Sequence, residues 1–162
     1  TVGNLLNRTS SMARRWFDGG VPEPATAAQP SHPLAQQAQQ AQTVYSAAME
    51  QLAFREAAEA ALNLAIAANG FLNEQAPWSR IKQPDQSHQV ADDLYAVLEA
   101  TRQVALLLAP LVPALSERML AQFPPATPGD WVGQLAWGLL PAHAPLPEPS
   151  PVMARLELEE DL

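Results

Sequence analysis

The sequence predicts an all-α protein, a bundle of about five helices with an irregular proline-rich C-terminal segment. Long stretches carry apolar residues at intervals of three and four positions, which places them on one face of a helix. No substantial stretch alternates apolar and polar residues in the way that a half-buried β-strand does. Prolines and a glycine pair fall between the periodic stretches, where they end helices.

The length of 162 residues suits one domain with a buried core and is too short for two ordinary domains. We therefore expect a single helical domain over 1–162, with a low-complexity loop and helix extension at 22–42 and an irregular segment at 124–162. The absence of cysteine excludes disulfides and thiolate chemistry. No apolar run approaches the roughly twenty residues of a membrane span, so we expect a cytoplasmic protein without a membrane partner.

The first helix is expected over 2–17 and has two distinct faces. Its polar face carries a ridge at i, i+4, i+7 and i+11, formed by Asn4, Arg8, Ser11 and Arg15. Gly19 and Gly20 are expected to supply the left-handed conformation that ends such a helix. The apolar face comprises Val2, Leu5, Leu6, Thr9, Met12, Ala13, Trp16 and Phe17. A helix that begins without a preceding cap leads us to expect a piece cut from a longer chain.

The next two helices follow a proline-rich stretch, 22–33, that predicts an exposed loop. The Gln/Ala run behind it favours an N-terminal extension of a second helix that ends at 52, and a third helix is expected over 54–75. The inward residues expected of the second helix are Val44, Tyr45, Ala48 and Leu52. The buried residues expected of the third are Ala58, Ala61, Leu62, Ala65, Ile66 and Leu72.

The fourth helix is expected over 88–109, with Ser87 as its cap and Asp92 and Asp93 near the positive end of its dipole. Adjacent helical residues diverge by about 100°, so these carboxylates are assigned to capping rather than to a shared metal or acid–base site. A fifth helix is expected over 114–123, and Trp131 and Trp137 are expected to pack on the bundle. The three histidines lie far apart without zinc-binding spacing, so no metal site is expected.

The end of the third helix carries the strongest functional pattern. Pro77 stops the helix and is expected to hold Ala76 in an extended conformation. Trp78 then falls just past the helix end, with Arg80 and Lys82 alternating behind it. An indole beside two cations suits stacking on a nucleobase while the cations meet phosphates. A tryptophan folded back on the core, with ordinary solubilising charges beside it, fits the same spacing, and the polar ridge of the first helix equally fits a solvated face.

The net charge of −8 argues against indiscriminate binding of DNA or RNA, because phosphate contacts require cations. The basic residues are nevertheless unevenly distributed. Segments 4–22 and 67–82 contain five of the nine, with Asp18 and Glu74 as their only acids. This distribution favours one defined site over a general affinity for polyanions.

Two segments resemble the anticodon-binding domain of methionyl-tRNA synthetases. A-N-G-F-L-N-E-Q-A-P-W-S, residues 68–79, resembles the A-N-x-Y/F-x-x-x-x-x-P-W segment of that domain. N-L-L-N-R-T-S-S-M-A-R-R-W-F-D-G-G-V-P, residues 4–22, resembles its first helix and F-D-G-x-V-P exit. Residues 45–54 and 106–120 match as well, and 151–158 resembles the closing segment of short methionyl enzymes, which leads us to expect the natural C-terminus here.

The resemblance implies recognition of the C-A-U anticodon of methionine tRNA, in service of ATP-dependent attachment of methionine. It implies that Trp78 stacks on the first anticodon base, that Asn4 and Arg8 bond base edges, and that other cations hold phosphates. The H-x-G-H and K-M-S-K-S elements of the class I active site are absent here, so no catalytic residue or cofactor is expected in this chain. A missing catalytic domain, which would bind ATP, is an expected partner. The residues implied to contact RNA are Trp78, Asn4, Arg8, Arg14, Arg15, Arg80 and Lys82, with Asn73 a weaker candidate.

Two alternatives stay open at the level of sequence. One is a helical protein–protein or oligomerisation module without RNA contact, which the acidic balance and alanine-rich helices favour. The other is the equivalent anticodon-binding domain of another class I synthetase. The A-P-W segment favours the methionine enzyme over this second alternative.

Overall fold

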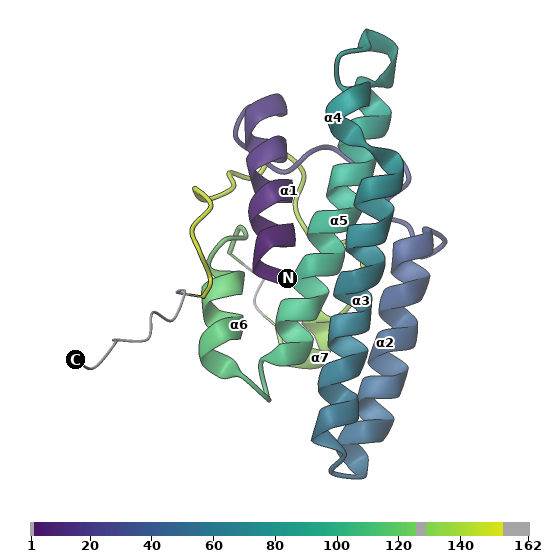
Figure 1. Ribbon diagram of the computed structural model, residues 1–162, viewed down its shortest axis with the longest axis vertical. Helices are drawn as coiled ribbons and strands as arrows, with labels where there is room; N and C mark the ends of the chain where they lie inside the picture. Colours follow the sequence, from purple (N-terminus) through teal and green to yellow (C-terminus); the bar gives the residue numbers. More distant parts are fainter. Residues whose placement is uncertain (1, 126–128, 154–162) are drawn as a thin grey trace, which may run out of the picture.

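The computed structural model describes residues 2–125 and 129–153, and within these ranges it is built from helices without a β-strand, which confirms the predicted fold class. Five longer helices make up most of this part of the chain, and Figure 1 shows their arrangement. Two single turns, α4 (Pro77–Arg80) and α7 (Trp131–Gln134), and a 3-10 turn at Pro84–Gln86 lie between them. The longer helices are α1 (Val2–Trp16), α2 (Pro33–Glu50), α3 (Phe54–Gln75), α5 (Ser87–Leu108) and α6 (Pro113–Leu120).

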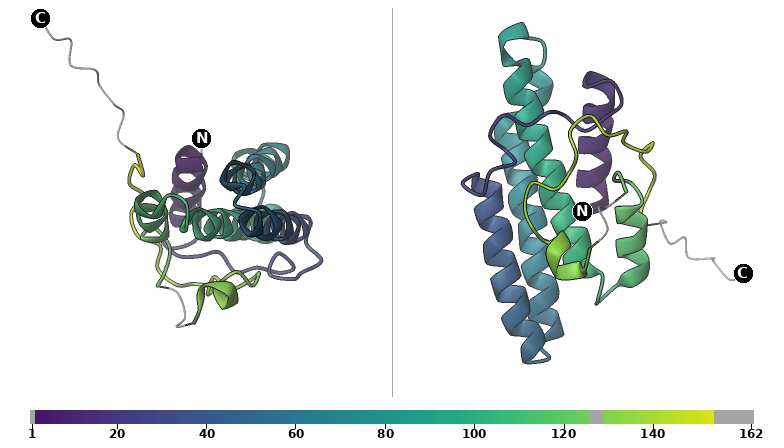
Figure 2. Two further views of the ribbon diagram at one scale, coloured as in Figure 1. Left: turned by 90° about the horizontal axis from the view of Figure 1, so that it is seen from below. Right: turned by 180° about the vertical axis from the view of Figure 1, so that it is seen from behind.

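Helix α5 is the centre of the bundle. It packs against α1, α2, α3 and α6, and Figure 2 shows α1 and α3 on one side of it and α7 with the C-terminal segment on the other. Every residue from Val90 to Leu108 is buried, so the predicted apolar side is confirmed but the helix has no solvent face. Its polar side chains must therefore find partners inside the protein.

The hairpin of α2 and α3 is packed largely through alanine. The buried side of α3 runs through Ala57, Ala61, Leu64 and Ala68 and faces α2 and α5. The prediction that Leu62 and Ile66 are buried is wrong, since they are 42% and 68% exposed. Small side chains let the helix backbones approach closely, so the alanine stripe takes the interior and the adjacent larger residues face outward. The prediction that Val44 and Leu52 face inward is also wrong, whereas Tyr45 and Ala48 are buried as predicted. Leu52 lies beyond the end of α2, in a left-handed conformation with φ 57°.

The chain leaves α1 through the F-D-G-G-V-P segment. The two left-handed residues are Asp18 and Gly19, with φ of 51° and 76°, so the prediction of a left-handed Gly20 is wrong. Gly20 is required by a close approach instead, because a Cβ there would lie 3.0 Å from the His143 carbonyl oxygen. The segment is thereby joined to the C-terminal segment, with the Val21 N–H donating to the Ala144 carbonyl at 2.9 Å.

Asp92 and Asp93 do not cap α5, and the predicted capping role is wrong. The helix begins at Ser87, which is therefore not its cap, and both carboxylates lie in its second turn, buried against other segments. Asp92 accepts hydrogen bonds from the backbone N–H groups of Ala25, Thr26 and Ala27 at 2.7–2.9 Å. Burial alone would raise the pKa of Asp92, but these bonds outweigh it and lower the pKa below its ordinary value. Asp92 thus orders the proline-rich loop, which is fixed to the bundle rather than merely exposed.

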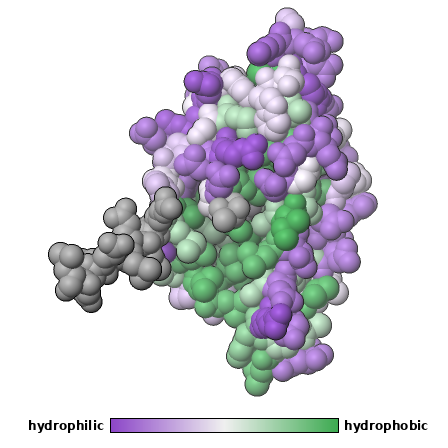
Figure 3. Space-filling model, viewed as in Figure 1, coloured by the Kyte–Doolittle hydropathy of each residue, from purple (hydrophilic) through white to green (hydrophobic). Residues whose placement is uncertain are grey.

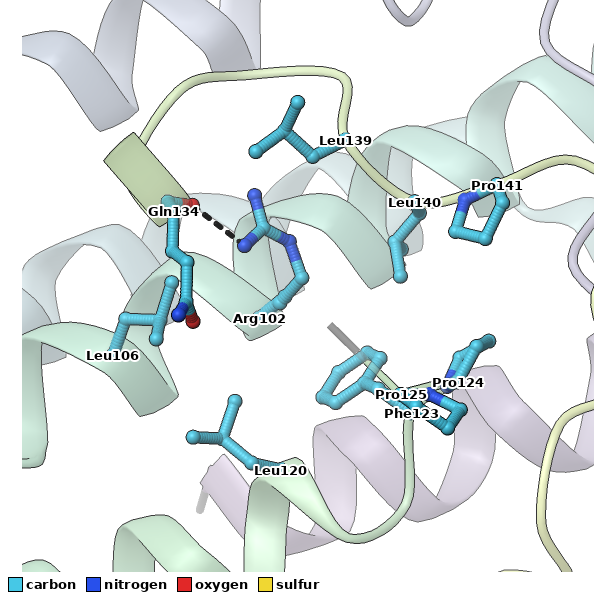
Figure 4. Close-up of a pocket in the computed structure, with 10 residues that line it drawn as sticks. All are labelled: Arg102, Leu106, Leu120, Phe123, Pro124, Pro125, Gln134, Leu139, Leu140 and Pro141. Atoms are coloured by element: carbon cyan, nitrogen blue, oxygen red, sulfur yellow. Dashed lines mark hydrogen bonds between the residues drawn. The ribbon is translucent and has the colours of Figure 1, made fainter. Parts of the chain in front are cut away.

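Hydrogen bonds join the C-terminal segment to α5 and to the loop before α2. The indole N–H groups of Trp131 and Trp137 donate to the carbonyls of Leu106 and Ala27, which confirms that both tryptophans pack on the bundle. A buried ion pair, Glu99–Arg102, contributes the other main bonds. Beside it lies a cavity of about 110 Å³ with mostly apolar walls, shown in Figure 4. Most of the closing segment 151–158 lies outside the described residues.

Candidate nucleic-acid interface

The chain reverses sharply where α3 meets α4. Ala76 has φ 44° and ψ 58°, so the prediction of an extended Ala76 is wrong. The left-handed conformation also avoids the right-handed helical region that a following proline disfavours. It ends α3 through a bond from the Ala76 N–H to the Leu72 carbonyl at 3.0 Å. Buried Pro77 then occupies the first position of α4, where its missing N–H costs nothing.

Trp78 is the second residue of α4 and stands at the surface. Its exposed fraction is 39%, which excludes a tryptophan folded deep into the core. The guanidinium carbon of Arg8, on α1, lies 5.6 Å from the centroid of the indole ring, within the range of a cation–π contact. Two segments about seventy residues apart in the sequence therefore meet at this point.

The polar ridge of α1 lies at the surface as predicted. Asn4, Ser11 and Arg15 are exposed. Arg8 is half-buried, and its guanidinium lies over the Trp78 ring. Asn4 is one helical turn before Arg8 on the same face of α1. The ridge and the indole thus form one surface with amide, guanidinium and aromatic groups, which we call the Trp78 surface (Asn4, Arg8, Trp78).

Arg80 is occupied within the protein. Its Nη1 donates to the Asp93 carboxylate at 2.7 Å and to the side chain of Gln75 at 3.1 Å, and its Nη2 donates to the side chain of Gln86 at 3.1 Å. Its side chain is 23% exposed and that of Asp93 only 3%. The guanidinium that the resemblance assigns to phosphate therefore joins the ends of α3 and α5.

The other candidate cations differ in exposure and in their contacts within the protein. Half-buried Arg14 donates from Nη1 to the carbonyl of Leu146, which ties α1 to the C-terminal segment. Arg15 and Lys82 are exposed, as is Asn73 near the end of α3. Among these cations, Arg15 and Lys82 are the two whose side chains are exposed.

Sequence reasoning missed the partners of Arg80, namely Gln75, Gln86 and Asp93. The signal that points to Asp93 is the apolar run that follows it directly in the same helix, Leu94 to Leu98. A carboxylate in such a helix is buried and requires a cation or several donors. The spacing along the chain does not identify which cation, because Arg80 lies in a different element.

The face shown in Figure 3 divides into two regions. Hydrophilic side chains cover its upper half, and hydrophobic side chains gather over its lower half, where α6 and the lower part of α3 lie. Exposed apolar residues include Leu62 and Ile66 of α3 and Val112, which directly precedes α6. We call these three residues the apolar surface.

Within the described ranges the structure shows neither a metal-binding group nor an unpaired charge in the cavity of Figure 4. No group of three histidine, aspartate or glutamate side chains is placed to hold a metal ion in 2–125 and 129–153. None of the helices described is both long enough and apolar enough to cross a bilayer. In the cavity of Figure 4, the Arg102 guanidinium is bound to Glu99 and to the Gln134 carbonyl, so the cavity offers no unpaired charge to a ligand.

A family model described as the anticodon binding domain of methionyl tRNA ligase matches residues 21–160. The chain belongs to this family. A methionine–tRNA ligase of Thermosynechococcus vestitus is 44% identical to it over 97% of the chain and 31% of the relative. A chloroplastic/mitochondrial methionine–tRNA ligase of Arabidopsis thaliana is 31% identical over 99% of the chain and 27% of the relative. The anticodon-binding domain described here thus spans about a third of the length of these curated relatives.

Solved structures of methionyl-tRNA synthetase share the fold of this anticodon-binding domain. The apo Mycobacterium tuberculosis enzyme superimposes with a TM-score of 0.87 at 26% identity, over 97% of this chain and 32% of that one. The same enzyme in complex with methionyl-adenylate gives a TM-score of 0.82 at 26% identity, over 95% of this chain and 30% of that one. Both similarities extend over nearly all of the bundle.

Proposed function

We propose that this domain recognises the C-A-U anticodon of methionine tRNA through the Trp78 surface. The observation that supports this most directly is the exposed Trp78 indole with the Arg8 guanidinium 5.6 Å from its centre. Sequence-specific reading of RNA uses unstacked bases, which aromatic side chains stack against and polar side chains bond along their edges. Trp78 supplies the stacking face, and Asn4 and Arg8 supply the edge contacts.

Phosphate contacts in this proposal are few. Exposed Arg15 and Lys82 meet the backbone of the anticodon loop, and exposed Asn73 is a weaker candidate for a further polar contact. With a net charge of −8, the domain gains affinity from defined contacts rather than from a general positive field. Such a surface discriminates among anticodons more than it attracts nucleic acid.

The chemistry of aminoacylation belongs, in this proposal, to the part of the enzyme that this chain does not cover. That part would bind ATP and methionine, and the domain described here would hold the tRNA in place in the cytoplasm. Within the printed sequence there is one lysine and no H-x-G-H element, which supports this division of labour.

The remainder of the synthetase is the proposed occupant of the apolar surface. The chain covers 31% and 27% of two curated relatives, so a full enzyme of their length would hold a large partner for this domain. Leu62, Ile66 and Val112 are 42%, 68% and 42% exposed. Figure 3 shows hydrophobic side chains gathered over this part of the molecule, and a large exposed apolar patch marks an interaction site.

Anticodon specificity is tested by titrating the 162-residue chain with a methionine anticodon stem-loop and with stem-loops altered at single anticodon positions. We expect each altered base to weaken binding by roughly tenfold or more, because a mispaired buried contact costs about 1–3 kcal/mol. Equal affinity for all stem-loops would contradict the proposal. If this chain binds none of the stem-loops, the result would favour a protein–protein module. A preference for another anticodon would favour the domain of another synthetase.

The domain interface is tested by Ile66→Ser. We expect no measurable loss of stability in the chain alone, since the side chain is mostly exposed, and a lower unfolding temperature in the complete synthetase. Burying an isoleucine stabilises by about 1.5–3 kcal/mol. Val132→Ser is the matched control, because Val132 is 69% exposed but lies on α7. An equal shift for both variants in the complete enzyme would contradict this occupant.

A further inference from the structure

The connection between α3 and α5 is held together by one guanidinium. Arg80 donates to Gln75, the last residue of α3, through both its side-chain oxygen and its carbonyl, at 3.1 and 3.3 Å. It donates to Gln86, in the 3-10 turn before α5, at 3.1 and 3.3 Å. It donates to Asp93 within α5 at 2.7 Å. Arg80 therefore joins both ends of this connection to the central helix.

Asp93 is the fixed end of this arrangement. Its side chain is 3% exposed and lies on the helix that every long helix of the bundle packs against. The amide of Gln89 donates to its second carboxylate oxygen at 3.1 Å, which orients the carboxylate towards Arg80. A buried carboxylate held in this way keeps its position better than an exposed surface partner would.

Helix α4, by contrast, has little stability of its own. It is a single turn of four residues whose N-cap residue, Ala76, makes no side-chain capping bond. One helical turn is unfavourable in isolation, because several backbone dihedrals are fixed for one hydrogen bond. The direction in which Trp78 points therefore depends on what holds the turn, and Arg80 lies two residues after the indole in that same turn.

We propose that Arg80 and Asp93 are positioning residues that hold the Trp78 indole against Arg8 and ready for a base, and that Arg80 makes no phosphate contact. The stacking of a base on Trp78 rests on the proposed function, whereas the positioning of the indole by Arg80 and Asp93 rests on the hydrogen bonds above. The cluster (Gln75, Arg80, Gln86, Asp93) is named the Arg80 clamp. It converts a flexible turn into a rigid presentation of the stacking group, which lowers the ordering cost of binding.

The two possible roles of Arg80 predict opposite signs for one variant. Asp93→Asn removes the buried negative charge and loosens the guanidinium. If Arg80 positions Trp78, this variant weakens binding of the methionine anticodon stem-loop by roughly threefold to tenfold, a typical range for coupled neighbours. If Arg80 instead contacts phosphate, the variant frees its guanidinium to bind the RNA, and binding becomes tighter. Tighter binding by Asp93→Asn would overturn the proposal.

A double-mutant cycle gives a second test on the same chain. Arg80→Ala is expected to weaken binding by a similar factor when Trp78 is present and by less than about twofold in the Trp78→Ala background. The dependence of log affinity on log salt concentration should be unchanged. An equal loss in both backgrounds, with the salt slope smaller by about 0.7, would identify a phosphate contact and overturn the clamp. Arg80→Lys should rescue a phosphate contact but not a clamp that needs a planar fork.

An RNA-free readout separates failure of the clamp from failure of the proposed function. In the chain labelled with 5-fluorotryptophan, the fluorine resonance of Trp78 is assigned with Trp78→Phe. We expect Arg80→Ala and Asp93→Asn to shift or broaden that resonance while those of Trp131 and Trp137 stay in place. A Trp78 resonance that neither variant changes would overturn the clamp, whether or not the stem-loop binds. Unaltered resonances of the other tryptophans verify that the bundle is folded.

Discussion

Replacing Glu99 with alanine is expected to lower the free energy of unfolding by about 3–5 kcal/mol, because it leaves the Arg102 guanidinium buried without its counter-charge. Glu99 has no exposed surface. One of its oxygens accepts the Arg102 Nε–H at 2.9 Å, and the other accepts the backbone N–H of Gly138 at 3.0 Å. The substitution thus removes both an ion pair and an anchor of the C-terminal segment.

Urea denaturation followed by circular dichroism measures this effect. Glu117→Ala, on the exposed side of α6, is the control and should change the free energy of unfolding by less than about 0.5 kcal/mol. A double replacement, Glu99→Met with Arg102→Met, should cost less than Glu99→Ala alone, because no unpaired charge then remains inside. A loss below about 1 kcal/mol for Glu99→Ala would show that the pair is not the anchor described above.

Replacing Trp78 with alanine is expected to weaken binding of the methionine anticodon stem-loop by roughly tenfold to a hundredfold. Loss of one base–aromatic stack costs about 1–3 kcal/mol. The fold should be little affected, since the indole is 39% exposed and its described partner is a surface guanidinium. In the complete synthetase the same variant should lower aminoacylation of methionine tRNA at limiting tRNA concentration.

Trp78→Phe is the matched control for this prediction. It keeps an aromatic face of smaller area, so it should retain more affinity than Trp78→Ala. Trp137→Phe is the control for tryptophan substitution in general, because the Trp137 indole N–H donates to the Ala27 carbonyl and Trp137 is not part of the Trp78 surface. Aminoacylation unchanged by Trp78→Ala would remove Trp78 from the proposed site.

Much of this fold is predictable from local sequence rules. Helical periodicity locates the five longer helices to within a few residues, and the prolines at 77, 110 and 113 mark their ends. The errors occur where two patterns compete on one helix. In α3 the alanine stripe and the Leu62/Ile66 stripe lie next to each other, and only packing against α2 and α5 decides which is buried.

The acidic pair on α5 illustrates a second limit. Asp92 and Asp93 follow the helix start closely enough to resemble first-turn acids, and helix-dipole rules then assign them to capping. Their actual partners are a loop and an arginine that lie 65 and 13 residues away in the sequence. Non-local pairing of buried charges is set by tertiary packing, which no spacing along one helix reveals.

The site was predictable where local sequence rules decide the structure, and not where contacts between distant segments decide it. The exposure of Trp78 follows from Pro77, which ends α3 and starts a new turn, and the α1 ridge follows from helical spacing. The contact of Arg8 with Trp78 requires the packing of α1 against the rest of the bundle. The engagement of Arg80 by Asp93 likewise requires the fold, so the sequence pattern of alternating cations pointed to phosphate instead.

The most direct test of base stacking on Trp78 is a titration of the 5-fluorotryptophan-labelled chain with the methionine anticodon stem-loop. We expect the Trp78 fluorine resonance to shift in step with binding and to shift more than those of Trp16, Trp131 and Trp137. We also expect that changing the first anticodon base reduces this shift at equal saturation. A saturated complex in which the Trp78 resonance stays in place, while the resonance of another tryptophan shifts, would contradict base stacking on Trp78.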